Sequence, residues 1–164
     1  MVYTFIPLYI RDSGFGVNIT GWVLFLVVVP LILLEVPAGH LADKFGFKKF
    51  FVTGFLIMAA LGISTFFIKS PIIILTLLIL ASVGAAFVEP LREAYFFEAI
   101  KKQDEVRFYP IYRVALPFGQ LAGPLIFSTI LLLTKTNYNI LFAVIGCLML
   151  IAAFAAMFLK DIRK

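Results

Sequence analysis

The sequence predicts an all-α membrane protein. Of its 164 residues, 63% are hydrophobic and only 14% are charged, and the mean hydropathy of +1.09 is far above that of water-soluble domains. A helix needs roughly 20 apolar residues to cross the hydrocarbon core of a bilayer. Stretches of about that length without Asp, Glu, Lys or Arg occur at 13–34, 50–68, 70–88, 114–134 and 136–159. We expect each of these to be a transmembrane helix.

A sixth apolar segment, residues 1–10, is too short to cross the bilayer. At about 1.5 Å per residue it reaches roughly 15 Å, which is half of the hydrocarbon core. It has neither the basic leader nor the small-residue cleavage site of a signal peptide. We interpret it as the end of a helix whose start is missing. The chain, 1–164, then forms a single transmembrane domain.

Polar residues separate these segments. Turn-forming residues stand at 12–16, 69–71 and 134–139. The longest polar segment, 92–107, mixes charges with aromatic residues, so we expect it to begin as the end of the fourth helix and then to run along the membrane surface. Aromatic anchoring at the membrane surface is expected for Trp22, Tyr3, Tyr9, Tyr109, Tyr112 and Tyr138, which fall mostly near span ends.

The loops on one side of the predicted bundle are far more basic than those on the other. The basic side carries Lys44, Lys48, Lys49, Arg92, Lys101, Lys102, Arg107, Arg113, Lys160, Arg163 and Lys164, whereas the opposite side carries Arg11, Lys69 and Lys135. Cytoplasmic loops have such an excess of Lys and Arg. We therefore expect an integral protein of the cell (plasma) membrane whose carboxyl terminus is cytoplasmic.

Several other classes of function are excluded. The net charge of +5 is spread over loops and the tail, so nucleic-acid binding is not expected. The single Cys147 lies in the last span, where we expect a packing residue. No metal-ligand spacing, nucleotide-binding glycine loop or paired catalytic side chains occur within the spans. The sequence predicts neither an enzyme nor a bound metal or cofactor.

A short charged segment after the first complete span has a distinctive spacing. It reads Gly39-His40-Leu41-Ala42-Asp43-Lys44-Phe45-Gly46-Phe47-Lys48-Lys49. This spacing resembles the signature loop of the major facilitator superfamily, although Phe47 stands where Arg is commoner. The resemblance covers essentially the whole chain. It implies half of a major facilitator fold, with five complete helices and the end of a truncated first helix, arranged as two inverted three-helix repeats, 1–68 and 69–164.

The resemblance assigns roles to residues of this loop. Gly39 is expected to allow close helix approach and Gly46 a tight reversal. Asp43 is expected to latch the cytoplasmic side when the carrier faces outward, with Gly39, Lys44, Gly46, Lys48 and Lys49 completing the latch. A carboxylate near a helix amino terminus gains about 0.3–1 kcal/mol, which suits a latch that must also release. The alternative is an ordinary basic turn that only fixes topology.

A second motif lies in the fifth helix. Gly119 and Gly123 share one helix face, which permits close packing, and Pro124 removes a backbone hydrogen bond and permits a bend. These residues resemble the family's glycine-proline motif. Phe127 and Ser128 stand where the antiporter version has further glycines, so antiport is not inferred. Small-residue packing alone is the other explanation.

Charged residues close to the predicted spans form a third group. A charge within the hydrocarbon is costly, by about 2.5–3.5 kcal/mol on insertion scales, so such residues usually face partners, a cavity or the interface. We expect a cytoplasmic charge network of Glu35, Glu89, Arg92, Glu93 and Arg113, working with Asp43. The i, i+3 spacing of Glu89 and Arg92 permits an ion pair. The competing interpretation is that these residues are solvated helix ends, and for Glu35 a proton-carrying role is the alternative to a position at the rim.

The resemblance also implies a mechanism. We expect a secondary active transporter that moves a small solute by alternating access, coupled to an ion gradient, with the lipid bilayer, a small-molecule substrate and the missing other half as its partners. The clear signature loop suits the first half of a carrier. We nevertheless favour the carboxyl-terminal half, because the fourth helix lacks the Arg and glycine pattern expected of a first half and only a short tail follows the last span. By analogy, helices one and four line the substrate path, helices two and five meet the other half, and helices three and six face lipid. The alternative function is a non-transporting structural or assembly subunit. The substrate cannot be read from this sequence.

Overall fold

The described chain consists of helices and the links between them. The computed structural model describes residues 2–160. The elements are α1 (Val2–Asp12), α2 (Val17–Phe45), α3 (Phe47–Ser64), the 3-10 helix η1 (Thr65–Phe67), α4 (Pro71–Ala99), α5 (Glu105–Leu133) and α6 (Tyr138–Ala156). Five of them, with η1 continuing α3, are long and apolar enough to cross a membrane. The all-α membrane fold is confirmed. The expectations for Met1, Arg163 and Lys164 lie outside the described residues.

Helix α2 extends well beyond the predicted span. It runs through Glu35 and Pro37 to Phe45, so residues 39–45 form its last turns and the prediction of a loop there is wrong. Only Gly46 interrupts the chain before α3, and its positive φ of 89° is a conformation that favours glycine. Charged residues show where the chain leaves the hydrocarbon, but they do not show where the helix ends. Leu, Ala and Lys favour helix beyond that point as well.

The polar segment 92–107 begins as the end of the fourth helix, as predicted, because α4 continues to Ala99. A short link then joins it to α5, which begins at Glu105, so the segment forms a helical hairpin. Both arms contain proline: Pro90 lies in α4, and Pro110, Pro117 and Pro124 lie in α5. Each proline removes one intrahelical hydrogen bond.

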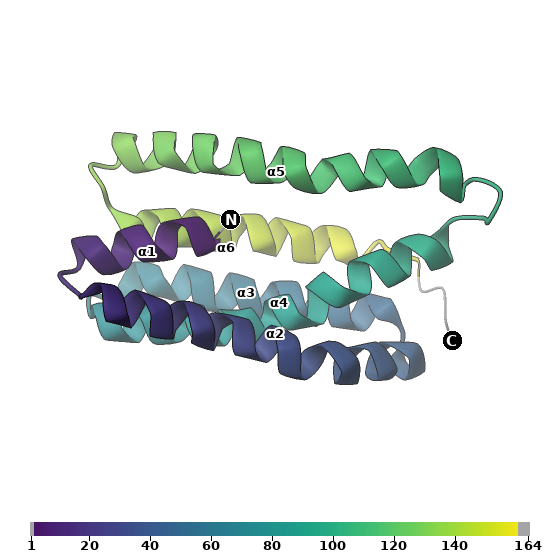
Figure 1. Cartoon of the computed structure of the whole chain (residues 1–164), viewed down its shortest axis with the longest axis horizontal. Helices are drawn as coiled ribbons and strands as arrows, with labels where there is room; N and C mark the ends of the chain where they lie inside the picture. The colour runs from purple at the N-terminus through teal and green to yellow at the C-terminus, as the bar shows by residue number, and fades with distance from the viewer. Residues whose placement is uncertain (1, 161–164) are drawn as a thin grey trace.

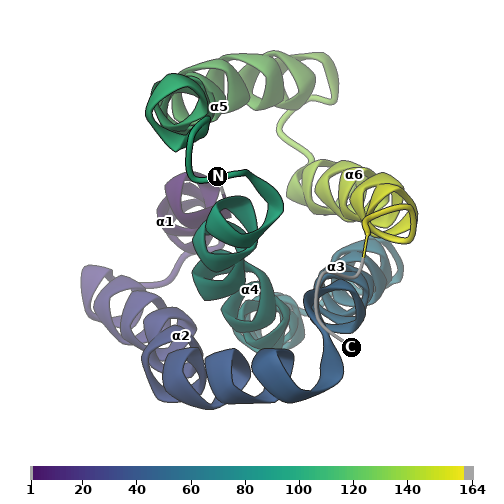
Figure 2. The same ribbon diagram turned by 90° about the vertical axis from the view of Figure 1, so that its right-hand side faces the viewer.

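Helix α4 occupies the centre of the bundle. Seen end-on, the other helices surround it, with α5 set apart from the rest (Figure 2). Helix α2 packs along α4, and α3 packs against both α4 and α6. In the side view, the carboxyl-terminal part of α4 rises toward α5, and the short α1 lies beside one half of the bundle only (Figure 1).

Two pairs of glycines bring α3 close to its neighbours. A Cβ atom built on Gly54 would lie 2.6 Å from the carbonyl oxygen of Gly84 on α4. A Cβ atom on Gly146 of α6 would lie 2.7 Å from the backbone nitrogen of Ile63 and 2.9 Å from the carbonyl carbon of Gly62. Such close approach of backbones is typical of helix packing in membranes. By contrast, a Cβ atom on Gly39 would meet nothing within 4 Å, so no described helix approaches closely at Gly39.

Hydroxyl groups within the spans bond to their own helices. Thr76 donates to the carbonyl oxygen of Ile72 at 2.9 Å, and Thr129 donates to that of Leu125 at 2.9 Å. The buried Thr65 and Ser82 donate to carbonyl oxygens three residues earlier, each at 2.7 Å. Among the described residues, no buried side-chain nitrogen or oxygen lacks a hydrogen-bond partner. The polar atoms of these side chains are therefore satisfied without bonds between helices.

The glycine contacts predict a selective effect of a single methyl group. Gly146→Ala should lower the free energy of unfolding by about 1–3 kcal/mol, because the new Cβ atom would overlap the backbone of α3. The matched control is Gly21→Ala in α2, where a Cβ atom would meet nothing within 4 Å. This control should be neutral or stabilising, because alanine favours helix over glycine. Thermal unfolding of both variants in the same detergent measures the difference, and equal stability would contradict the packing argument.

Candidate functional site

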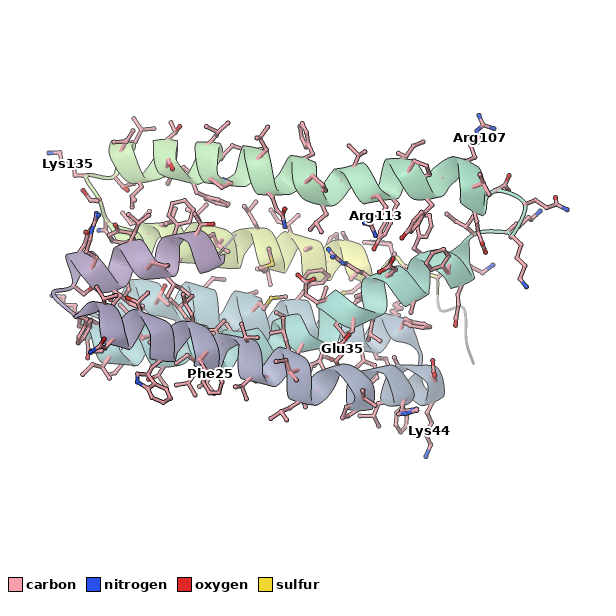
Figure 3. The ribbon with its side chains drawn as sticks, in the orientation of Figure 1. Phe25, Glu35, Lys44, Arg107, Arg113 and Lys135 are labelled. Carbon is pink, nitrogen blue, oxygen red and sulfur yellow. The ribbon has the colours of Figure 1, made fainter. Side chains whose placement is uncertain are left out.

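The two ends of the bundle carry different charges. The basic end, defined here as the end with the α2–α3 turn and the α4–α5 hairpin, presents Lys44 and Arg107, whereas Lys135 lies at the opposite end (Figure 3). Arg11, in the last turn of α1, and Lys69, in the link between η1 and α4, also lie at the opposite end. The uneven distribution of Lys and Arg predicted from the loops is thus a difference between two ends of one helical bundle.

The predicted latch residues lie around the α2–α3 turn. Asp43 and Lys44 are exposed in the last turn of α2, and Lys48 and Lys49 are in the first turn of α3. Asp43 therefore sits at the carboxyl end of its own helix, where the helix dipole disfavours a carboxylate, and the amino end of α3 follows directly. Beneath it, a buried cluster fixes the turn; its members are Ala42, Phe47, Phe51, Leu91 and Ala156.

The predicted charge network divides into separate groups. Arg92 and Glu89 form an ion pair of 3.5 Å between Nη2 and Oε2, with both side chains substantially exposed. Such a pair contributes about 0–1 kcal/mol. Glu35 is exposed on α2, ten residues before the end of that helix. The predicted set thus does not form one continuous chain of ion pairs.

A tyrosine joins two other members of the predicted network. Tyr109 Oη donates to Glu93 Oε1 at 3.0 Å, and Arg113 Nη1 donates to Tyr109 Oη at 3.1 Å. Figure 3 shows Arg113 directed from α5 toward α4, whereas Arg107 points away. Sequence reasoning assigned Tyr109 to the membrane surface and missed this bridge. The i, i+4 spacing of Tyr109 and Arg113 could have indicated that these two side chains are neighbours on one helix. The contact with Glu93 could be inferred only with knowledge of the hairpin.

The predicted glycine motif lies within the continuous helix α5, and close packing at this motif stays a prediction. Gly123 is buried, Gly119 is partly exposed, and Pro124 lies within the continuous helix. The glycine pairs that bring backbones together belong to α3, α4 and α6. The regular spacing of Gly119 and Gly123 stood out in the sequence, whereas the contacting glycines are far apart along the chain.

An apolar cavity of about 310 Å³ lies among the five long helices. Its wall includes Phe127 and Phe142, against which Phe5 and Tyr9 of α1 pack edge-on. It extends from there to Glu89, near the basic end of α4. The cavity thus lies next to the aromatic contacts that α1 makes with α5 and α6, and it continues toward the basic end. Among the described residues, no group of three or more His, Cys, Asp or Glu could hold a metal ion.

At the opposite end, hydrogen bonds tie α1 and α6 together. Tyr138 Oη donates to Asp12 Oδ2 at 2.6 Å, and Arg11 Nε lies 3.1 Å from Asp12 Oδ1. These hydrogen bonds, from Tyr138 first and Arg11 second, hold the pKa of Asp12 below its usual value of 3.8. Asn139 Nδ2 also donates to the carbonyl oxygen of Ile68 at 2.6 Å, which connects α6 to the α3–α4 link.

Taken together, five apolar helices of spanning length with charge gathered at their ends define a helical integral membrane protein. The chain belongs to the Major Facilitator Superfamily, whose family model matches residues 1–164. This confirms the family to which the sequence motif pointed.

The chain also resembles curated relatives over part of its length. The chain is 30% identical over 119 residues to multidrug resistance protein MdtH of Shigella sonnei, covering 68% of this chain and 29% of that protein. It is 29% identical over 125 residues to MdtH of Proteus mirabilis, covering 76% of this chain and 31% of that protein. The chain thus spans about a third of the length of these relatives. No solved structure matches.

The bond between Tyr138 and Asp12 predicts a pH-dependent effect. Because the folded pKa of Asp12 is lowered, its ionisation stabilises the fold above about pH 3.8, and this contribution is lost as the pH falls through the lowered folded value. Tyr138→Phe removes the hydroxyl donor, so the variant should be less stable than the wild type at pH 7. The difference should shrink as the pH falls below 3.8. Unfolding in detergent across this range tests it, and a gap that stays constant would contradict the role of Asp12.

Proposed function

We propose that this chain is part of a secondary active transporter that moves a small solute across the plasma membrane by alternating access. The observation that carries the proposal is the match of the Major Facilitator Superfamily model to all 164 residues. Five helices of spanning length agree with it. The relatives carry the name multidrug resistance protein, which supports drug-like compounds as the first substrates to test.

A complete carrier requires a second group of helices, which we propose as the partner of this chain. Helices α2 and α5 have the fewest buried residues, 11% and 17% of their most apolar stretches, compared with 22–33% for the other spans. Large apolar side chains such as Trp22 and Phe25 on α2 and Leu121 and Leu125 on α5 are exposed. This supports the expectation that helices two and five meet the other half.

The proposed orientation places the basic end in the cytoplasm. The excess of Lys and Arg at that end supports it. In this arrangement the α2–α3 turn faces the cytoplasm, and Asp43 with its neighbouring lysines stabilises the outward-facing state. We further propose that transport is coupled to an ion gradient; the given sequence contains no nucleotide-binding glycine loop.

Flux into vesicles tests the function. The chain is reconstituted alone, and also within its full-length gene product if the reading frame continues beyond it. Uptake of a panel of fluorescent drug-like compounds is then followed under imposed pH and sodium gradients. Gradient-dependent flux above that of empty vesicles is expected for the complete carrier. Unchanged flux under every gradient would favour the alternative, a structural or assembly subunit of the membrane.

The latch proposal predicts a specific loss. Asp43→Asn should reduce the initial transport rate by about two- to fivefold, because the proposed latch sets this carboxylate against the amino end of a neighbouring helix, an interaction of about 0.3–1 kcal/mol. Membrane insertion should be unchanged. Asp104→Asn, the same chemical change in the α4–α5 link, is the matched control and should transport at the wild-type rate. A wild-type rate for Asp43→Asn would remove Asp43 from the mechanism.

A further inference from the structure

The two halves of α5 are held in different ways. In the half near the opposite end, Gly123 and Phe127 are buried, and the Phe127 ring packs edge-on against Phe5 at 6.3 Å between centroids. In the half near the basic end, before Pro117, no residue of α5 is buried, and the apolar residues Val106, Phe108, Ile111, Val114 and Leu116 are exposed. One half of α5 is therefore anchored in the core, whereas the other depends on contacts at its beginning.

Those contacts are made by four aromatic rings, named here the aromatic clasp: Phe96 and Phe97 at the end of α4, and Tyr109 and Tyr112 at the start of α5. Phe96 and Tyr112 stack with centroids 4.4 Å apart and planes inclined by 24°. Phe97 and Tyr109 lie 5.3 Å apart at 32°. Stacked pairs of this kind are favourable beyond the area that they bury.

Tyr109 also forms hydrogen bonds with two charged side chains beside the clasp. Its hydroxyl accepts a hydrogen bond from Arg113 at 3.1 Å and donates one to Glu93 at 3.0 Å, while the Arg113 guanidinium lies 5.7 Å from the centre of its ring. Hydrogen bonds to charged groups are stronger than neutral ones. One hydroxyl group thus links a carboxylate of α4 to a guanidinium of α5.

The α4 side of the clasp is fixed to the rest of the bundle. Leu91 is buried with Phe47 and Phe51. Tyr95 packs edge-on against both of these phenylalanines, and its hydroxyl donates to the carbonyl oxygen of Lys160 at 3.2 Å. If the clasp opens, α5 is therefore the arm that moves. Pro117 lies between the clasped and the anchored half of α5, and it removes the backbone hydrogen bond to the carbonyl of Arg113.

We propose that the aromatic clasp is a releasable contact that holds the basic end of α5 against α4, with the Tyr109 hydroxyl as its positioning group. When the clasp opens, the first half of α5 swings away from α4 about its proline-containing middle, while the half around Phe127 stays in place. The role of this movement in transport rests on the proposed function, but the movement itself is measurable without a substrate.

The test compares two tyrosine variants that lose the same atom. In a Cys147→Ser background, spin labels are attached to cysteines at Lys49 and Arg107, which are exposed at the starts of α3 and α5. A second pair at Ile72 and Leu132, both exposed at the opposite end, reports on the anchored half. Distance distributions of the full chain in lipid nanodiscs are measured for the wild type, Tyr109→Phe and Tyr112→Phe.

Tyr109→Phe should increase the population of long 49–107 distances relative to short ones by about tenfold, since it breaks both hydrogen bonds to charged partners and keeps the ring. The 72–132 distribution should not change. Tyr112→Phe keeps the ring stacked on Phe96 and should match the wild type at both pairs. An unchanged 49–107 distribution in Tyr109→Phe, or equal widening in both variants, would overturn the proposal. A change at 72–132 as well would also overturn it, because the anchored half would then not be fixed. None of these outcomes depends on whether flux is observed, so the clasp and the transport function can fail separately.

Discussion

The close approach of α3 to α4 and α6 is the constraint on which the rest of the bundle depends. Lipid offers no hydrophobic driving force between helices, so packing must come from contact between surfaces. At Gly54 and Gly84, and at Gly62 and Gly146, the absence of a side chain lets the backbones of neighbouring helices meet. These contacts fix α4 in the centre, and α4 in turn determines where α2 packs and where α5 can be held.

The two ends of this frame are joined by similar chemistry in different settings. At each end a tyrosine hydroxyl donates to a carboxylate on another helix: Tyr138 to Asp12 at 2.6 Å, and Tyr109 to Glu93 at 3.0 Å. The Tyr138 bond lies over a buried layer of apolar residues shared by all the long helices except α3. The Tyr109 bond lies on an exposed hairpin whose second arm has few buried residues. The Tyr138 bond therefore joins helices at a firmly packed end of the bundle, whereas the Tyr109 bond joins helices at a loosely packed end.

The sequence was sufficient for the class of fold because each span must satisfy its own backbone in lipid, so helix existence follows from composition and length. It was less informative about where helices end. Residues 35–45 and 92–99 are polar enough to leave the hydrocarbon, yet they continue as helix. Glu89 and Arg92 could be paired from their spacing because both lie on one helix. The bridge through Tyr109 and the glycine contacts join segments that are distant in sequence or in different helices, and spacing along the chain carries no record of such contacts.

The hydroxyl groups that bond back to their own helices have a consequence for how the protein is made. Several Ser and Thr side chains can enter the bilayer with their hydroxyl groups already satisfied within one helix, as Thr76 is by the carbonyl oxygen of Ile72 and Thr129 by that of Leu125. Insertion therefore does not have to wait for a partner helix to arrive. The order in which the spans leave the translocation machinery can follow the chain, and the fit between glycine surfaces can be completed afterwards within the membrane.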